Sequence, residues 1–311
     1  MGYRIDIKRL IIYILIAILL ILVIRGCVAA NRQKKQREEN LPLTSDFILK
    51  VYDHKADSVR SMPLEEYLIG VTAAEMPASF EPEALKAQAV AARTFTVRRM
   101  VAFGGKPCGK GGCDVCTDSS CCQAWESDAA MEKNWGKNHD KYYEKVRSAV
   151  YGTRGMIAIY DSEPIEAMYH STSGGRTEDS ENVYSSALPY LRSVESPGEE
   201  NAPYYAGEEN YSRKNFAKLV NKNFPKADLS ARKLEDQVKI LSRYNSGRVA
   251  ELKIGKTTVT GREFRGALEL QSTNFDIIFR KDDVKIKTIG FGHGVGLSQL
   301  GANAMAKEGA S

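Results

Sequence analysis

Three prolines determine where helices can begin and end between residues 63 and 99. Pro63 suits the first position of a helix, because the N–H that proline lacks would have no partner there. Pro77 disfavours the helical conformation at the residue before it, so the first helix should end near Glu75. Pro82 begins a second helix, in which five alanines favour helix formation and close packing. The sequence therefore predicts two helices joined by a proline-containing corner.

Glu75 is the residue of this stretch that most suggests chemistry. It would lie at a helix C-terminus, where the negative end of the helix dipole disfavours a further negative charge. Its neighbours Val71, Ala73, Ala74 and Met76 are apolar, and desolvation also disfavours the ionised carboxylate. Both effects would raise its pKa toward that of a general acid. A solvated or salt-bridged glutamate at a helix end is the alternative on this pattern alone.

Two long motifs of the chain resemble those of a known family. The first, EMPASFEPEALKAQAVAARTF, covers residues 75–95, and the second, GFGHGVGLSQLGA, covers residues 290–302. Both are similar to the signatures of the stage II sporulation protein D family, in the same order. Shorter segments at 171–177, 188–196 and 272–275 are also similar, so the resemblance covers residues 45–305.

The resemblance implies an activity. Members of this family are membrane-anchored lytic transglycosylases, which cleave the glycan strands of peptidoglycan during spore engulfment. The muramoyl O6 hydroxyl of the substrate attacks its own anomeric carbon, so one carboxylate can act first as acid and then as base. Glu75 would be that carboxylate.

The resemblance also implies the other site residues. Arg93 would orient the substrate or stabilise charge, and Tyr190 and Arg192 would complete the catalytic group. Family members commonly have lysine where this chain has Arg192, a difference that matters if the contact is bidentate. Substrate would be bound by four further residues, namely His170, Ser173, His293 and Gln299.

Three classes of function are compatible with these motifs to different degrees. The resemblance favours the transglycosylase, acting on peptide-free glycan strands beside a sporulation amidase and an integral membrane protein. A non-catalytic, glycan-binding enhancer of an amidase is the main alternative. A zinc hydrolase is a third interpretation, but a closed thiolate site leaves no open position for a reactive water.

The formal net charge of +5 is unevenly distributed. Residues 1–39 contain eight Lys and Arg against three Asp and Glu, which leaves 36 residues of each sign in the remainder. The body is therefore neutral overall. This argues against nucleic-acid binding by bulk charge and favours contact between the N-terminal region and anionic lipid headgroups.

An apolar run from Leu10 to Ile24 predicts how the chain is anchored. A spanning helix needs about 20 residues, a length that is reached if the run extends to Ala30 and Arg25 snorkels to the interface. A cleaved signal peptide is the alternative. With the resemblance, we predict a cytoplasmic tail at 1–9, a single-pass transmembrane anchor at 10–30, a linker at 31–44 and an extracytoplasmic catalytic domain at 45–311.

We predict a mixed α+β fold in this single catalytic domain, with a cysteine-rich loop at 104–128 as an insertion. A strand at 47–52 precedes the two helices. After the loop, helical patterns occupy 128–150 and strand-like patterns occupy 155–160 and 165–170. The remaining predictions are a loop at 196–210, a polar helix at 211–221 and alternating strands from 238 to 289.

Five of the six cysteines lie between residues 108 and 122. Cys113, Cys116, Cys121 and Cys122 have the spacing of a metal chelate, and Cys108 is the alternative to Cys113 as fourth ligand. Disulfides are the competing interpretation outside the membrane, although five thiols cannot all pair within the cluster. By resemblance, some relatives bind zinc at the positions of Cys116, Cys121 and Cys122, with histidine usual at Cys121. We therefore predict a structural, non-catalytic zinc site.

Overall fold

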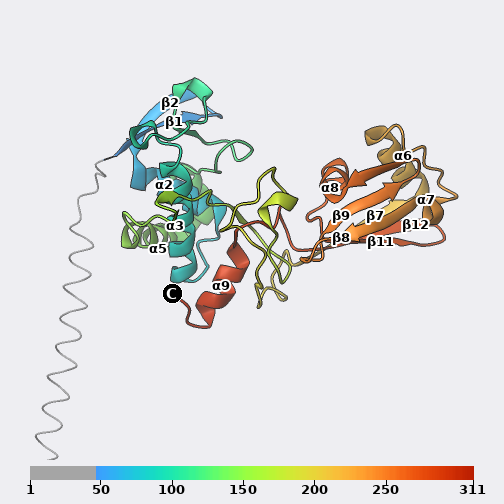
Figure 1. The fold of residues 1–311 in the computed structure, drawn as a ribbon. Helices are drawn as coiled ribbons and strands as arrows, with labels where there is room; N and C mark the ends of the chain where they lie inside the picture. Colours follow the sequence, from blue (N-terminus) through green and yellow to red (C-terminus); the bar gives the residue numbers. More distant parts are fainter. Residues whose placement is uncertain (1–46) are drawn as a thin grey trace, which may run out of the picture. The chain divides into compact units, whose positions relative to one another are not determined.

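The computed structural model describes residues 47–311, which form one compact unit. The predicted tail, membrane anchor and linker lie outside the described residues. Within 47–311, no helix has both the length and the apolar composition that a membrane crossing requires. Helices and strands are mixed along this unit (Figure 1), so the predicted α+β class is confirmed for the described part of the chain.

The first hydrophobic core lies among helices and one small sheet. β1 (Ile48–Asp53) pairs antiparallel with β2 (Ser58–Pro63) and parallel with β3 (Val115–Cys116). Buried and exposed residues alternate along β1, so this strand gives one face to the core. The helices that complete this core are α2 (Leu64–Glu75), α3 (Pro82–Val97), α4 (Asp128–Trp135) and α5 (His139–Gly152).

The two proline-bounded helices have nearly the predicted limits. α2 ends at Glu75, and Met76 is extended at φ −129° and ψ 134°, as expected before Pro77. α3 begins at Pro82. The difference is at Pro63, which ends β2 and precedes α2, because its ψ of 143° continues the extended strand.

Arg93 and Glu65 form a buried ion pair in this helical core. Arg93 donates from Nη2 to Glu65 Oε2 at 2.7 Å and from Nε to Oε1 at 3.2 Å, and the two side chains are 1% and 3% exposed. Its other hydrogen bonds reach Val150 O, Thr153 Oγ1 and Met156 O, at the end of α5 and just beyond it. Arg93 therefore joins α2, α3 and α5.

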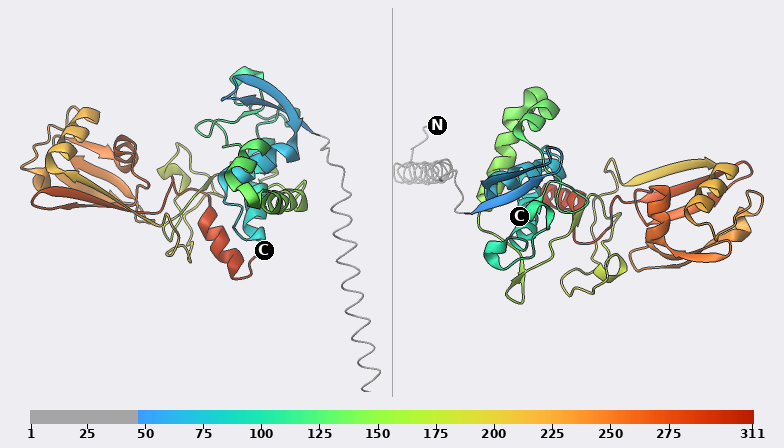
Figure 2. Two further views of the ribbon diagram at one scale, coloured as in Figure 1. Left: turned by 180° about the vertical axis from the view of Figure 1, so that it is seen from behind. Right: turned by 90° about the horizontal axis from the view of Figure 1, so that it is seen from above.

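Residues 153–205 have short strands and turns that lead to the second motif. β4 (Ile159–Tyr160) pairs with β5 (Glu163–Pro164), and β6 (Tyr169–His170) pairs in parallel with β13 (Leu297–Ser298). β13 continues into α9 (Gln299–Lys307), which packs against α3 (Figure 2). The 290–302 motif is thereby brought beside the 75–95 motif, where the Glu81 N–H donates to Asn303 Oδ1 at 2.8 Å.

The second hydrophobic core contains two three-stranded sheets and three helices. One sheet has the order β11 (Phe275–Phe279), β12 (Asp283–Ile289), β7 (Ala206–Ser212), and the other has the order β10 (Thr257–Thr260), β9 (Val249–Ile254), β8 (Val238–Arg243). The helices are α6 (Arg213–Asn223), α7 (Leu234–Gln237) and α8 (Gly261–Leu268). Phe216, Phe264 and Phe275 are fully buried between them.

Two elements of this half differ from the prediction. The predicted loop at 196–210 runs into β7, whose side chains are mostly exposed and so lack the apolar alternation of a half-buried strand; pairing with β12 holds it in place. α8 interrupts the predicted series of strands. It begins with a capping box, in which Thr260 and Glu263 each bond the other's backbone N–H, a signal that is present in the sequence.

Replacing Arg93 with Met should lower the free energy of unfolding by roughly 3–5 kcal/mol, because Glu65 would stay buried without its partner. Denaturant unfolding of the purified protein measures this loss. The double variant Glu65→Leu, Arg93→Met removes both charges and should recover most of it. A loss below about 1 kcal/mol in the single variant, the range of an exposed pair, would contradict this role of Arg93.

Candidate functional site

Glu75 ends α2 beside the last residues of the cysteine-rich loop. Its Oε1 accepts a hydrogen bond from the backbone N–H of Ala124 at 2.7 Å. The segment approaches α2 closely, since the Glu126 N–H donates to Gly70 O at 3.1 Å. A Cβ on Gly70 would fall 2.2 Å from Trp125 Nε1. Only glycine therefore permits the approach that holds Ala124 against the carboxylate.

Burial raises the pKa of Glu75 above its usual value of 4.5, which is the direction that the sequence predicts. Desolvation is the largest cause, because the charged form loses its contact with water. Hydrogen bonds from the Ala124 N–H and the Tyr169 hydroxyl act in the opposite direction without cancelling the shift. The site thus favours a bound proton and also stabilises the anion that remains after the proton leaves.

Tyr169 connects Glu75 to the second motif through a polar network. Its single O–H hydrogen is shared between two acceptors, Gln123 Oε1 at 3.0 Å and the Glu75 carboxylate. Gln88 of α3 is a further neighbour of this hydroxyl and accepts a hydrogen bond from Gln299 Nε2 at 3.2 Å. Gln299, predicted to bind substrate, therefore contacts Gln88 from within the protein, where it is 7% exposed.

His170 and His293, both predicted to bind substrate, lie together with ring centroids 5.7 Å apart. His170 Nδ1 lies 3.1 Å from Val295 O and must donate to it, because a carbonyl oxygen only accepts. His293 Nδ1 accepts from the Val295 N–H at 3.1 Å. Desolvation lowers the pKa of His170 to about 3 and that of His293 to about 4. Both rings are therefore neutral at physiological pH.

Arg248, directly before β9, inserts into the glycine-rich run at 290–296. It is 1% exposed and donates from Nη2 to Ser173 O at 2.7 Å and from Nη1 to Arg176 O at 3.0 Å. Gly294 has φ 86°, and a Cβ there would lie 2.4 Å from the guanidinium. Gly294 is thus required for this close approach, and Arg248 joins the second core to the segment that carries His293.

Ser173, also predicted to bind substrate, belongs to a buried hydrogen-bond network around Glu199. Glu199 is 1% exposed, and its carboxylate accepts from the Ser173 hydroxyl at 2.8 Å and from the Ser173 N–H at 2.7 Å. The hydroxyls of Ser196 and Ser298 donate to it at 2.6 and 2.7 Å. Ser173 therefore supports the loops around His293, since its hydroxyl is already bonded and only 1% of the residue is exposed.

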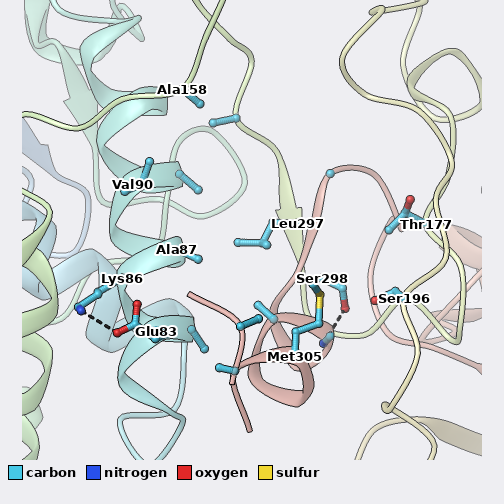
Figure 3. Close-up of a pocket in the computed structure, with 18 of the residues that line it drawn as sticks. Glu83, Lys86, Ala87, Val90, Ala158, Thr177, Ser196, Leu297, Ser298 and Met305 are labelled. Carbon is cyan, nitrogen blue, oxygen red and sulfur yellow. Dashed lines mark hydrogen bonds and ion pairs between the residues drawn. The ribbon is translucent and has the colours of Figure 1, made fainter. Parts of the chain in front are cut away.

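A cavity of about 990 Å³ lies between α3, α9 and residues 152–196 (Figure 3). Its wall is mostly apolar and includes Ala87, Val90 and Met305. Tyr190 and Arg192 line this cavity, whereas Glu75, His170 and His293 do not. Two of the predicted catalytic residues thus line this cavity, and Glu75 is not among its lining residues.

The remaining contacts of the predicted arginines and tyrosine are structural in character. The Tyr190 hydroxyl accepts from the Glu166 N–H at 3.2 Å. Arg192 is held by Glu181 in an ion pair and donates to Ser180 Oγ at 3.3 Å. Arg93 holds the helical core, as described above. None of the groups that it bonds is also bonded to Glu75.

Four thiols of the cysteine-rich loop converge on one point. The Sγ atoms of Cys108, Cys116, Cys121 and Cys122 all lie within 4.8 Å of one another. Tetrahedral zinc with Zn–S bonds of about 2.3 Å holds its sulfurs roughly 3.8 Å apart, so this donor set fits such an ion after small shifts. All five cysteines of residues 47–311 are free thiols.

The fourth thiol of the group is Cys108, which corrects the prediction of Cys113. Cys113 is fully buried, and its Sγ lies 3.6 Å from Gly111 O instead of joining the cluster. The 3-10 turn at Lys110–Gly112 and the positive φ of Gly109 reverse the chain between these two cysteines. Cys108 is thereby folded back, with its N–H bonded to Asp114 O at 3.2 Å.

Several residues of this site were not predicted from the sequence. Gln88 lies inside the 75–95 motif, and Tyr169 lies two residues before the similar segment at 171–177. Each is a polar residue within buried surroundings, and this could have marked it as a site residue. Gln123 and Ala124 follow the cysteines directly, but nothing local indicates that they meet α2. Arg248 stands alone in its strand region, and no local pattern marks it.

The chain is similar to proteins of sporulation. A family model described as "Stage II sporulation protein" matches residues 52–160. Stage II sporulation protein D of Bacillus subtilis (strain 168) is 41% identical over 265 residues, which cover 85% of this chain and 75% of that protein. The protein of the same name from Bacillus amyloliquefaciens is 40% identical over 280 residues, which cover 90% and 78%. An amidase enhancer of Bacillus subtilis (strain 168) is 30% identical over 293 residues, covering 78% of this chain and 38% of that protein.

The Cys108→Ser variant should bind zinc more than a hundredfold more weakly than the unaltered protein, and the Cys113→Ser variant should bind it nearly as well. Four-thiolate zinc sites contribute about 10–16 kcal/mol, so one ligand accounts for roughly 3 kcal/mol. Competition with a chromogenic chelator measures both affinities. Equal affinities for the two variants would contradict the assignment of Cys108.

The Glu75→Gln variant should be more stable than the unaltered protein at neutral pH. A carboxyl whose pKa is raised on folding destabilises the folded state as pH rises through the interval between its unfolded and folded pKa values. The stability gain should therefore be absent well below pH 4.5, grow above it and then reach a plateau. Thermal unfolding across this pH range measures it, with Glu66→Gln, an exposed position of α2, as the control. A gain independent of pH would contradict the assigned cause.

Proposed function

Because this chain belongs to the stage II sporulation protein D family, we propose that it is a lytic transglycosylase that cleaves peptidoglycan glycan strands during sporulation. The observation that carries this proposal is the Glu75 carboxylate, whose pKa is raised by burial while two donors stabilise its anion. A group with both properties can hold a proton before the reaction and release it during the reaction.

The proposed reaction uses Glu75 twice. Protonated Glu75 donates to the glycosidic oxygen as the bond between that oxygen and the muramoyl anomeric carbon breaks. The resulting carboxylate, stabilised by Ala124 and Tyr169, takes the proton of the muramoyl O6 hydroxyl while O6 bonds to the anomeric carbon. The product has a 1,6-anhydromuramoyl end, and Glu75 is protonated again. This chemistry does not need the second carboxylate that most glycoside hydrolases use.

The other predicted residues differ in whether they could touch a bound glycan strand. His293 is partly exposed and is the best placed of the two histidines to touch a sugar, while His170, Ser173 and Gln299 support the surface from within. Tyr190 and Arg192 would meet a strand that extends over the cavity between α3 and α9. Arg93 would act only by holding α2.

A zinc ion held by Cys108, Cys116, Cys121 and Cys122 would have a structural role. Four thiolates complete a tetrahedral shell, so the ion would cross-link the loop and leave no position for substrate. Ala124, whose N–H bonds Glu75, lies two residues after Cys122. The ion would therefore hold the donor of this hydrogen bond in place.

We propose that the protein acts outside the cell membrane, on strands already freed of stem peptides, with a sporulation amidase and an integral membrane protein as partners. The alternative function is a non-catalytic glycan-binding module that enhances an amidase. The 30% identity to an amidase enhancer favours this alternative.

The Glu75→Gln variant should stay folded, bind glycan and lose at least a hundredfold in cleavage rate, because about 3 kcal/mol is the least that removing an acid catalyst costs. Anhydromuramoyl ends released from peptide-free strands are counted by mass spectrometry. Glu66→Gln, on the exposed side of α2, is the matched control and should keep full activity. Retention of more than a few per cent of the rate by Glu75→Gln would exclude Glu75 as the proton donor. A folded wild-type protein that binds strands without releasing such ends would favour the enhancer.

A further inference from the structure

Arg262 of α8 lies near His293, and among the residues that the structure describes it forms no ion pair. It donates to Val183 O, one residue before Tyr184. The Tyr184 ring meets the His293 ring edge-on, with centroids 5.7 Å apart. Arg262 is exposed, so its guanidinium is available to a ligand from solvent.

Arg265 approaches the same histidine from one turn further along α8, on the same side of the helix as Arg262. Its Nε donates to Leu270 O at 3.0 Å. The next carbonyl, of Gln271, accepts from the N–H of Gly292 at 3.0 Å, directly before His293. Two arginines of one helix therefore flank the glycine-rich run.

Among the described residues, no carboxylate is paired with Arg262 or Arg265, whereas the charge of Arg248 is partly offset by Glu178 and Glu199. Arg213 and Arg243 of the same core pair with Glu235 and Asp276, but within 47–311 no ion pair involves Arg262, Arg265 or the buried Arg248. After desolvation, the positive charges of Arg265, Arg248 and Arg262 are what lowers the pKa of His293. Two buried polar atoms here, His170 Nε2 and Arg248 Nε, also lack partners.

We propose that Arg262 and Arg265, beside His293, bind the lactyl carboxylate that a muramic acid residue exposes when its stem peptide has been removed. The inference rests on the proposed function and names the feature of the strand that the site selects. In an intact strand this carboxyl is an amide and carries no charge, whereas removal of the peptide leaves one anion on each muramic residue. Guanidinium groups match a carboxylate in charge and in bidentate geometry.

The arginines beside His293 are connected to Glu75 through one residue, Tyr169. The side chain of His293 bonds the backbone of Tyr169, the residue whose hydroxyl bonds Glu75. Tyr169 therefore connects the run beside the two arginines with the proton donor. Because the body of the chain has no net charge, this local attraction is the means by which a charged strand would be distinguished from an amidated one.

The test measures binding without cleavage, with full-length protein carrying Glu75→Gln. The probes are peptide-free glycan strands with free lactyl carboxylates and the same strands with these groups converted to methylamides. The carboxylate strands should bind about tenfold more tightly at low salt, or ~1.4 kcal/mol, and the preference should shrink as salt screens it. Adding Arg262→Gln and Arg265→Gln should remove the preference and leave binding of methylamide strands unchanged.

Arg232→Gln removes one charge from an exposed site of the same core and is the control. Equal affinity of the two strands for the starting protein would overturn the proposal, as would an equal loss on both strands in the double arginine variant or a matching loss with Arg232→Gln. Cleavage by the protein with Glu75 intact is measured separately. A carboxylate preference without anhydromuramoyl products would refute the transglycosylase and keep the carboxylate site. Cleavage with no preference in binding would refute the carboxylate site and keep the transglycosylase.

Discussion

The ion pair between Glu65 and Arg93 lies where α2, α3 and α5 meet, and both side chains are removed from water. Burying two charges is costly, and only close geometry with full hydrogen bonding offsets the cost, which Arg93 achieves with carbonyls of the α5 end. Such a pair tolerates little displacement of the helices that carry it. Glu75 lies ten residues beyond Glu65 on α2, about 15 Å along the axis, so its position depends on a pair that it does not touch.

Two opposing effects act on the pKa of Glu75, and they come from different parts of the chain. Desolvation by the helical core raises its pKa, while the Ala124 N–H and the Tyr169 hydroxyl lower it. Ala124 is placed by the cysteine-rich loop and by the close contact at Gly70. The loop is thus connected to the acid through one backbone hydrogen bond, and a metal ion at its four thiols would act on Glu75 by fixing that donor.

Local signals in the sequence predicted the helix ends well, because proline acts on its immediate neighbours: α2 ends at Glu75 and α3 begins at Pro82. Predictions that depend on residues far apart in the sequence could not be decided from local signals. Cys113 has the chelate spacing to Cys116 and Cys108 does not, yet the reversal at the glycine-rich turn between them brings Cys108 into the group. Arg93 lies within a motif whether it touches substrate or Glu65, and the motif alone does not distinguish these roles.

The strand β6 explains how acid chemistry and charge recognition can share one site without disturbing each other. Side chains of consecutive residues on a strand point to opposite faces, so Tyr169 faces Glu75 while His170 faces His293. A cation beside Glu75 would favour the carboxylate and lower its pKa, which would oppose its use as an acid. None of the arginines near His293 contributes to the pKa shift of Glu75. Positive charge that attracts a substrate anion can therefore be kept in this protein without removing the proton that the proposed reaction requires.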